Sequence, residues 1–313
     1  MSDSALVLEN VVKTYGDFKA VDDVSFAVPN GSVYGFLGPN GAGKTTSIRM
    51  ILEIIKPTSG QITVLGSNAL SVRDRIGYLP EEKGLYKKMK TWGVIAYFAT
   101  LKGVHRTEAK KIAYELLERY GLSDFAEQKT EALSKGMGQK VQVLASIAHK
   151  PEFVILDEPF SGLDPVNQQV MEEVIQDLAK SGATVIFSTH VMAHAERICE
   201  HIVLLAKGKK IFDGTIPEAR RTIPRRVRLR SSDDLQALSA IEGVVKMDRT
   251  DAEDPTLAPT YDLEITDGFE AQEILKFCFD KNLSLETFEQ TDPTLHDVFV
   301  HLVGPEAREA SFR

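Results

Sequence analysis

The chain has 313 residues, of which 43% are apolar and 26% are charged, with a formal net charge of −8 at pH 7. A chain of this length usually folds into about two domains, and its apolar content excludes an intrinsically disordered protein. The acidic balance excludes a broad electrostatic surface for nucleic acid. Residues 220–230 form a local basic run, which we interpret as a solvated linker or an edge strand.

The sequence has no pattern typical of a signal peptide or of a transmembrane helix. Its N-terminus lacks a basic region followed by an apolar stretch, and no window of about 18 residues is uncharged and continuously apolar. If the protein serves a membrane, we therefore expect another chain to span it. The two cysteines, Cys199 and Cys278, lie in apolar segments without metal-type spacing. We expect them to be buried free thiols.

The first two thirds of the chain alternate between predicted strands and predicted helices. Such alternation indicates an α/β fold with a largely parallel sheet covered by helices, interrupted here by a helical stretch. We predict strands at 5–8, 24–28, 32–37, 61–65, 75–79, 153–156, 184–188 and 202–205. We predict helices at 44–55, 107–120, 135–148, 166–180 and 192–199.

The character of the chain changes after about residue 217. Strands at 227–229, 244–247, 261–265 and 283–288 are separated by predicted helices at 233–241 and 269–279, and a last helix covers 294–302. The order β-α-β-β-α-β predicts a small α+β domain of ferredoxin-like type. We therefore expect two domains, 1–216 with a helical subdomain at about 83–150, and 217–313.

The segment 38–45 reads Gly-Pro-Asn-Gly-Ala-Gly-Lys-Thr and fits the pattern G-x-x-x-x-G-K-[ST] between a predicted strand and a predicted helix. Its glycines let backbone N–H groups converge on one anion, and the helix N-terminus adds a positive dipole end. We expect Lys44 to reach the β- and γ-phosphates of a nucleotide and the Thr45 hydroxyl to bind Mg²⁺. The predicted nucleotide-binding residues of the loop are Gly38, Pro39, Asn40, Gly41, Ala42, Gly43, Lys44, Thr45 and Thr46.

Two carboxylates follow the apolar strand 153–156. A buried parallel strand places its last residues at the carboxyl edge of the sheet, where ligands bind. We expect Asp157 to hold Mg²⁺ through water and Glu158 to orient or deprotonate the attacking water. The alternative is a strand that merely ends in a polar turn, which the phosphate-loop pattern makes the weaker interpretation.

Residues 1 to about 215 resemble the nucleotide-binding domain of ATP-binding cassette (ABC) ATPases through an ordered series of motifs. The letters LSKGM at 133–137 are similar to the ABC signature, and SGLD at 161–164 is similar to the D-loop. His190, which follows the strand 184–188, resembles the switch histidine. Tyr15, in the sequence Lys-Thr-Tyr-Gly, resembles the aromatic residue that stacks on adenine.

This resemblance implies a P-loop ATPase cassette that binds ATP and Mg²⁺ and acts as a dimer. Ser134 and Gly136 would bind the γ-phosphate of an ATP molecule that is bound to the phosphate loop of a second subunit. Asp164 would lie at the dimer interface. His190 would contact the γ-phosphate, with Glu158 and Lys44 as the other catalytic residues.

The sequence departs from the family pattern at two places. The signature has Lys135 where the family usually has Gly, and Met137 where it usually has Gln. Glu81 stands where the family usually has a Gln that helps to bind Mg²⁺ and reports the nucleotide state to the membrane subunit. Because carboxylate oxygens bind hard cations well, we expect Glu81 to be a ligand on the Mg²⁺ side, with a solvated loop residue as the alternative.

The resemblance also implies the partners. The family's helical subdomain accepts a short helix of an integral-membrane permease, and we expect Leu85, Tyr86 and Met89 to be exposed contacts, with most neighbouring aromatic residues in the core. The segment 292–299 is similar to the end of drug- and sodium-export-type ABC ATPases, which favours an exporter. We expect a homodimer on the cytoplasmic, inner face of the cell membrane, without nucleic acid as a partner.

One alternative from a different class is a soluble ABC ATPase that acts on ribosomes or DNA. Translation-type members carry two cassettes, whereas this chain has a single phosphate loop. Repair-type members carry a long coiled coil, and the stretch between the loop and Asp157 has no sustained heptads. A regulatory binder without catalysis would lack Lys44 or Glu158, and both are present.

Overall fold

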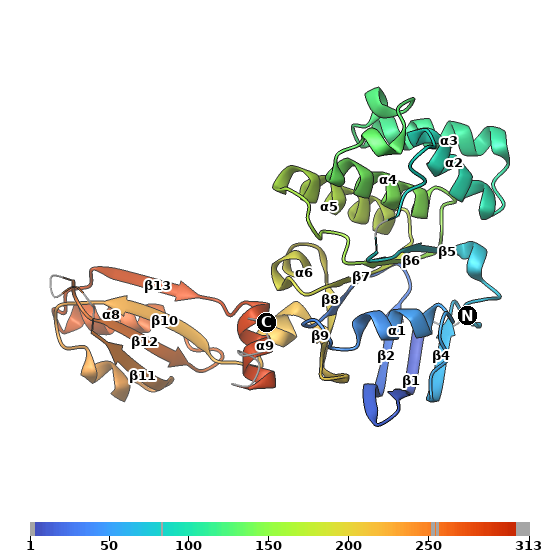
Figure 1. The fold of residues 1–313 in the computed structure, drawn as a ribbon. Helices are drawn as coiled ribbons and strands as arrows, with labels where there is room; N and C mark the ends of the chain where they lie inside the picture. The colour runs from blue at the N-terminus through green and yellow to red at the C-terminus, as the bar shows by residue number, and fades with distance from the viewer. Residues whose placement is uncertain (1–3, 83, 252–253, 255–256, 305–313) are drawn as a thin grey trace. The chain divides into compact units, whose positions relative to one another are not determined.

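The structure is a computed structural model that describes residues 4–82, 84–251, 254 and 257–304 (Figure 1). The chain divides into two compact units between Thr215 and Ile216. The first unit contains a small antiparallel sheet, a larger and mainly parallel sheet, and a group of helices. The second unit is an antiparallel sheet with its own helices.

The small sheet has the order β2-β1-β4, and both of its strand pairs are antiparallel. Its strands are longer than the short apolar runs of the sequence suggest, because polar residues alternate with the buried ones along β1 and β2. The strands are β1 (Ser4–Tyr15), β2 (Phe18–Pro29) and β4 (Ser59–Val64).

The larger sheet has the order β5-β6-β7-β3-β8-β9, in which every pair except β8 and β9 is parallel. Strands β6 and β7 are buried along their whole length, as expected for a parallel sheet covered on both faces. The strands are β3 (Val33–Leu37), β5 (Ile76–Leu79), β6 (Phe153–Asp157), β7 (Thr184–Thr189), β8 (His201–Ala206) and β9 (Lys209–Thr215).

Strand β9 was not among the predicted elements. It returns from β8 through a tight turn in which Lys207 and Gly208 both have positive φ, at 51° and 78°. Two successive left-handed residues are typical of a type I′ hairpin, whose twist matches that of the strands.

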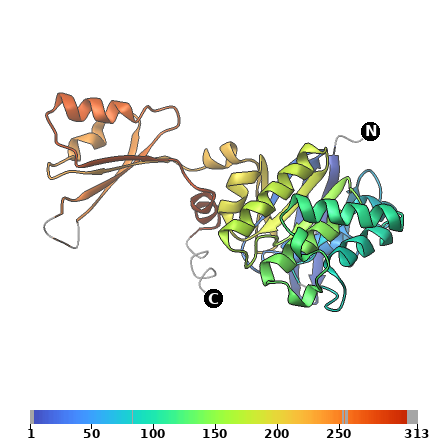
Figure 2. The same ribbon diagram turned by 90° about the horizontal axis from the view of Figure 1, so that it is seen from above.

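Helices cover the larger sheet from two sides (Figures 1 and 2). Helix α1 lies with the small sheet, whereas α4 and α5 lie across the opposite face, next to α2 and α3. The helices are α1 (Lys44–Ile51), α2 (Thr91–Leu101), α3 (Arg106–Arg119), α4 (Lys135–Ile147), α5 (Pro165–Lys180) and α6 (Met192–Ile198), with short 3-10 turns η1 (Arg73–Arg75), η2 (Ser123–Phe125) and η3 (Thr130–Ala132). Helix α1 ends before the predicted residue 55, because Glu53 takes a left-handed backbone with φ of 54°.

The second unit has the sheet order β11-β12-β10-β13, and all of its strand pairs are antiparallel. This is the ferredoxin-like order, so the predicted fold class is confirmed. The apolar residues of β10 and β12 pack against α8 and the 3-10 helix η4. The elements are α7 (Ile216–Arg220), β10 (Arg225–Arg230), η4 (Gln236–Ala240), β11 (Val244–Thr250), β12 (Thr260–Ile265), α8 (Gln272–Asp280), β13 (Thr287–Thr291) and α9 (Leu295–Val303).

Two predictions for this unit are wrong in detail. The α-helix expected at 233–241 is only the five-residue η4, because Leu235 and Leu238 are both fully buried and the backbone follows the core instead of a regular helix. The last strand is β13 and not 283–288, since the N–H of Leu283 still donates to the carbonyl of Cys278 at the end of α8. Leu283 therefore belongs to the helix terminus.

The basic run 220–230 is neither a linker nor an edge strand. Its larger part forms β10, which lies between β12 and β13. On the face of the sheet opposite the apolar core, Arg228 pairs with Asp262 at 2.7 Å and Arg226 with Glu264 at 3.5 Å. The acidic residues of the neighbouring strand thus neutralise two of the six arginines of the run.

Candidate functional site

The loop 38–43 connects β3 to α1, and at two of its positions only glycine fits without strain. Gly43 has φ of 99°, and a Cβ there would lie 2.5 Å from the carbonyl oxygen of Ala20. Gly38 has φ of 153°, and its Cβ would overlap the carbonyl oxygen of Leu205. Within the described chain, α1 has neither a side-chain cap nor an acidic residue in its first turn. Its N-terminal N–H groups are therefore available to an anion.

Lys44 is the first residue of α1, and its side chain turns back over the loop. Its Nζ donates to the carbonyl oxygens of Gly38 at 2.7 Å and Pro39 at 3.2 Å. The same atom lies 3.8 Å from Oε1 of Glu158. Burial lowers the pKa of Lys44, whereas the carboxylates of Glu158, Asp157 and Glu81 counteract that shift. The ammonium is thus held in a buried place where three carboxylates supply the opposite charge.

Asp157 ends β6 and is buried, with 1% of its surface exposed. Its Oδ1 accepts a hydrogen bond from the hydroxyl of Ser188, and its Oδ2 is buried without a hydrogen-bond partner among the described residues. Burial is the main cause that raises the pKa of Asp157, and the Ser188 hydrogen bond partly offsets it. A buried carboxylate oxygen without a partner beside a phosphate loop fits a hard cation such as Mg²⁺.

Glu158 follows directly and has a left-handed backbone with φ of 49°, which is costly for a residue other than glycine. Its N–H donates to Ser188 Oγ at 3.1 Å, and its Oε1 lies 3.0 Å from Nδ1 of His190. His190 comes from the loop after β7, next to β6 in the sheet. The structure therefore brings Lys44, Glu158 and His190 together from three different elements.

A pocket of about 340 Å³ lies in front of these groups. It contains most of the predicted phosphate-loop residues together with Glu81 and Glu158. Glu81, predicted from its position after β5, thus faces the same pocket as the loop and lies close enough to Asp157 to contribute to its raised pKa. The lining residues are Phe18, Ala20, Pro39, Asn40, Gly41, Ala42, Gly43, Lys44, Thr45, Thr46, Glu81 and Glu158.

Tyr15, the predicted base-stacking residue, is not part of this lining. It pairs with Phe18 across the turn between β1 and β2, so the two aromatic side chains leave the same face of the hairpin. Both are exposed, Tyr15 by 51% and Phe18 by 65%, and Lys13 Nζ lies 5.1 Å from the Tyr15 ring centroid. Phe18 was missed in the sequence, although its place opposite Tyr15 in a tight hairpin was a usable signal.

Ser134, Gly136 and Asp164 lie at a different place in the same unit. Ser134 caps α4 by accepting from the N–H of Met137 at 3.3 Å, and Asp164 caps α5 by accepting from the N–H of Asn167 at 2.9 Å. A Cβ on Gly136 would lie 2.9 Å from Nδ2 of Asn167, so any larger residue there would displace the Asn167 side chain. None of the three residues lines the pocket of the phosphate loop.

Two further residues that sequence reasoning missed support the carboxylates. Ser188 binds both Asp157 and the backbone of Glu158 from the neighbouring strand. Gln139, buried in α4, donates through its side-chain amide to the carbonyl oxygen of Pro159. Strand pairing and helix packing create these contacts, and the local sequence around either residue gives no sign of them.

The helical stretch carries an aromatic cluster formed by the exposed Tyr86 and Tyr97 and the half-buried Phe98. The rings of Tyr86 and Tyr97 meet edge to face with centroids 5.6 Å apart, and Phe98 lies 6.2 Å from Tyr86. Tyr86 is exposed, as predicted, whereas Leu85 and Met89 are half-buried. Tyr97 is 39% exposed and so belongs to the surface and not to the core as expected.

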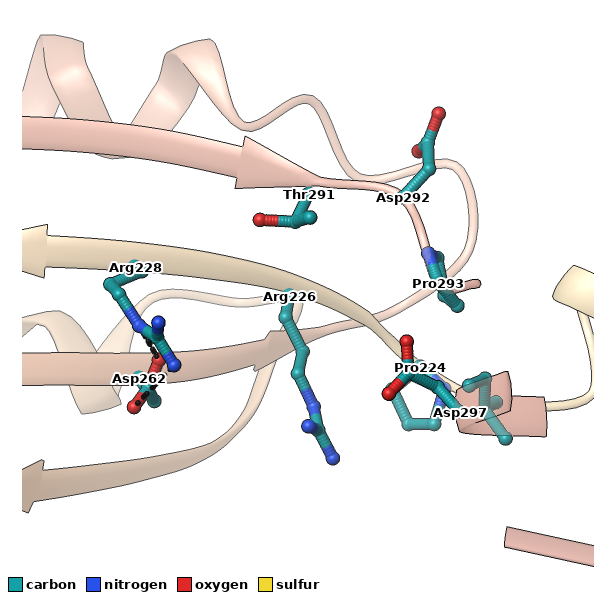
Figure 3. Close-up of a pocket in the computed structure, with 9 residues that line it drawn as sticks. Pro224, Arg226, Arg228, Asp262, Thr291, Asp292, Pro293 and Asp297 are labelled. Carbon is teal, nitrogen blue, oxygen red and sulfur yellow. Dashed lines mark hydrogen bonds and ion pairs between the residues drawn. The ribbon is translucent and has the colours of Figure 1, made fainter. Parts of the chain in front are cut away.

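The second unit has a smaller pocket of about 160 Å³ (Figure 3). Arg226 and Arg228 enter it from β10, and the ion pair of Arg228 with Asp262 closes one side. Asp297 faces it from the start of α9, where it forms a capping box with Thr294. The lining contains two arginines and three aspartates, so it has no excess of positive charge for a nucleotide phosphate.

Comparisons with known proteins agree with this geometry. The family model described as ABC transporter matches residues 21–161, and the C-terminal domain of DrrA1-3-like ATP-binding proteins matches residues 214–303. The chain is 41% identical to the uncharacterized ABC transporter ATP-binding protein YhaQ of Bacillus subtilis, over 96% of this chain and 98% of that protein. It is 32% identical to the daunorubicin resistance ATP-binding protein DrrA3 of Streptomyces coeruleorubidus, over 98% of each chain. A solved ATP-binding subunit of an ABC transporter superposes with a TM-score of 0.65 at 30% identity, over 70% of this chain and 93% of that one.

Asp157 gives a prediction for the protein without nucleotide. Because its folded-state pKa is raised, the charged form destabilises the fold above that pKa, and the cost disappears once the group is protonated. Asp157→Asn should therefore raise the free energy of unfolding at pH 7 by about 1 kcal/mol. Urea denaturation followed by circular dichroism measures the change, which should shrink as the pH falls through the pKa of Asp157.

Asp164→Ala serves as the contrasting variant. Hydrogen bonds from the backbone and side chain of Asn167 hold the pKa of Asp164 down. The loss of this helix cap should lower the free energy of unfolding at pH 7. Equal or lower stability of Asp157→Asn at pH 7 would show that the Asp157 carboxylate carries no burial cost.

Proposed function

The chain belongs to the ABC transporter family of ATP-binding proteins, which hydrolyse ATP to drive transport, and we propose that it powers an exporter as a dimer bound to a separate membrane permease. The observation that carries the proposal is that Lys44 and Glu158 line the phosphate-loop pocket and that His190 contacts Glu158, with 3.0 Å between Glu158 Oε1 and His190 Nδ1. This arrangement suits the transfer of a phosphoryl group to water.

In the proposed reaction, the loop N–H groups and the α1 N-terminus hold the β- and γ-phosphates of ATP. Lys44 then donates hydrogen bonds to the phosphate oxygens in place of the carbonyl oxygens of the loop. Glu158 orients the attacking water and accepts its proton, and His190 steadies the γ-phosphate beside Glu158. Catalysis here consists mostly of positioning and charge stabilisation.

Thr45, Asp157 and Glu81 are the residues we propose for Mg²⁺. The unpaired Oδ2 of Asp157 and the position of Glu81 on the pocket lining support this assignment. Bound Mg²⁺ would neutralise charge on the phosphate oxygens. Glu81 lies two residues after β5, on the segment that leads into the helical stretch. A ligand at this position would connect the Mg²⁺ site to that stretch.

We propose that Ser134 and Gly136 complete the site of a second subunit. In their own chain they lie outside the phosphate-loop pocket, at the start of α4 and against Asn167. Asp164, which caps α5 beside them, would lie at the same interface. ATP would therefore join two chains, each of which supplies one phosphate loop and one α4 N-terminus, and hydrolysis would separate them.

The aromatic cluster of Tyr86, Tyr97 and Phe98, in which the two tyrosines are exposed, is the proposed contact with the permease. Aromatic side chains that stay exposed on a helical surface suit the docking of an apolar helix from a partner. Among the helices of the described residues, none has the length and apolar character needed to cross a bilayer. We place the protein on the cytoplasmic face of the cell membrane, and the likeness to a resistance protein over both units supports export.

The first prediction from this mechanism concerns Glu158. Glu158→Gln keeps the shape of the side chain but removes its ability to accept a proton, so turnover should fall by about 100-fold or more. ATP binding should persist, and gel filtration with ATP and Mg²⁺ should show a dimer. Glu152→Gln is the matched control, because Glu152 pairs with Arg75 at the surface before β6. A variant that remains monomeric and still turns over would contradict the proposal.

A second prediction concerns Tyr15 and Phe18 as residues that stack on the adenine base. If the base stacks on the hairpin pair, Tyr15→Ala and Phe18→Ala should each weaken ATP binding by about fivefold to tenfold, with kcat at saturation unchanged. Competition with a fluorescent ATP analogue measures both affinities. Phe279→Ala is the control, since Phe279 is 82% exposed in the second unit. If Phe18→Ala binds ATP as tightly as the original chain, Phe18 has no part in base recognition.

A third prediction concerns the partner. Purification from detergent-solubilised membranes should recover the chain with a multi-span membrane protein, and Tyr86→Ala combined with Tyr97→Ala should remove that protein while leaving basal ATPase activity unchanged. Leu70→Ala, which alters a 57% exposed leucine elsewhere in the same unit, should leave the complex intact. Recovery of ribosomes or DNA in place of a membrane protein would favour the soluble alternative.

A further inference from the structure

The rings of Phe160, Phe187 and His194 pack together, and they come from the segments that flank Glu158 and His190. Phe160, two residues after Glu158, is 2% exposed. Its ring lies 5.7 Å from that of Phe187 in an edge-to-face arrangement and 4.4 Å from that of His194. Phe187 comes three residues before His190, and His194 comes four residues after it. Phe160 is thus held between the two sides of the segment that carries His190.

His194 takes part in this cluster as a ring and not as an acid or base. It is 8% exposed, and its Nδ1 has no hydrogen-bond partner within the part of the chain that the structure describes. Burial, together with the positive charge of Arg197 and the nearby His190, lowers its pKa to about 4. At neutral pH His194 is therefore uncharged and packs as an aromatic residue.

The contact between Glu158 and His190 needs such support. Glu158 has a strained backbone, and strained conformations persist only where the surroundings determine them fully. His190 is 46% exposed at its side chain, so packing around its own ring cannot fix its direction. The hydrogen bond from the N–H of His194 to the carbonyl of Val191, at 3.1 Å, ties His194 to the turn that follows His190.

We propose that Phe160 and His194 are positioning residues that hold Glu158 and His190 at their contact distance. Their rings fix the segment after β6 against the start of α6, and so set the positions of Glu158, which lines the phosphate-loop pocket, and of His190 beside it. The inference rests on the proposed roles of Glu158 and His190. It extends them to two residues that lie outside the lining of the pocket.

The test is a double-mutant cycle on the full chain, with kcat and KM for ATP measured by phosphate release. His194→Ala should lower kcat by about tenfold and leave KM within about twofold, because a small misplacement of reacting groups is costly while phosphate binding is unaffected. His194→Phe should keep at least half of the original kcat, because the ring is retained. His301→Ala, which alters an exposed histidine on α9, is the control and should change neither constant.

The cycle with His190 separates positioning from a general loss of structure. If His194 acts through His190, His194→Ala should cause little further loss in a His190→Ala background. Losses that multiply, a fall in ATP affinity parallel to that in kcat, or failure of His194→Phe to restore turnover would overturn the inference. Unchanged turnover in Glu158→Gln and His190→Ala would instead overturn the proposed function.

Discussion

The burial of a cluster of opposite charges at the carboxyl edge of the larger sheet is the constraint on which the rest of the first unit depends. Lys44, Asp157 and Glu158 are each less than 10% exposed, and Glu81 adds a third carboxylate nearby. Ionised groups that leave water are costly unless they are paired and hydrogen-bonded. The parallel strands supply hydrogen-bond partners, because they bring Ser188 and His190 to the same edge as the carboxylates.

In the chain alone, the polar and charged groups of this cluster do not all have partners among the described residues. Lys44 donates to carbonyl oxygens of its own loop, Asp157 keeps one buried oxygen without a partner among the described residues, and the N-terminus of α1 lacks a side-chain cap there. Each of these groups would gain a partner from ATP and its cation. The fold thus keeps a site of marginal stability that the ligand completes, which is a common cost of catalytic sites.

The sequence predicts those parts of the molecule that depend on local chemistry. The phosphate loop, the carboxylate pair after β6 and the alternation of strands and helices all follow from residue types at fixed spacing. It does not predict features that arise from contacts between distant segments. The support of Asp157 by Ser188 and the packing of His194 on Phe160 both depend on how elements meet. The short η4 has the same origin, because two buried leucines of the second core outweighed helical propensity.

The same packing bears on the proposal that two chains share each site. Gln139 binds the segment after Glu158, and Gly136 meets Asn167 beside Asp164, so the start of α4 is held against the start of α5. The N-terminus of α4 therefore cannot fold over the phosphate loop of its own chain without breaking these contacts. This supports the proposal that a second chain supplies these groups. Gln139 also links α4 to the segment after Glu158, so in the proposed dimer the state of one site would influence the N-terminus of α4 that takes part in the other.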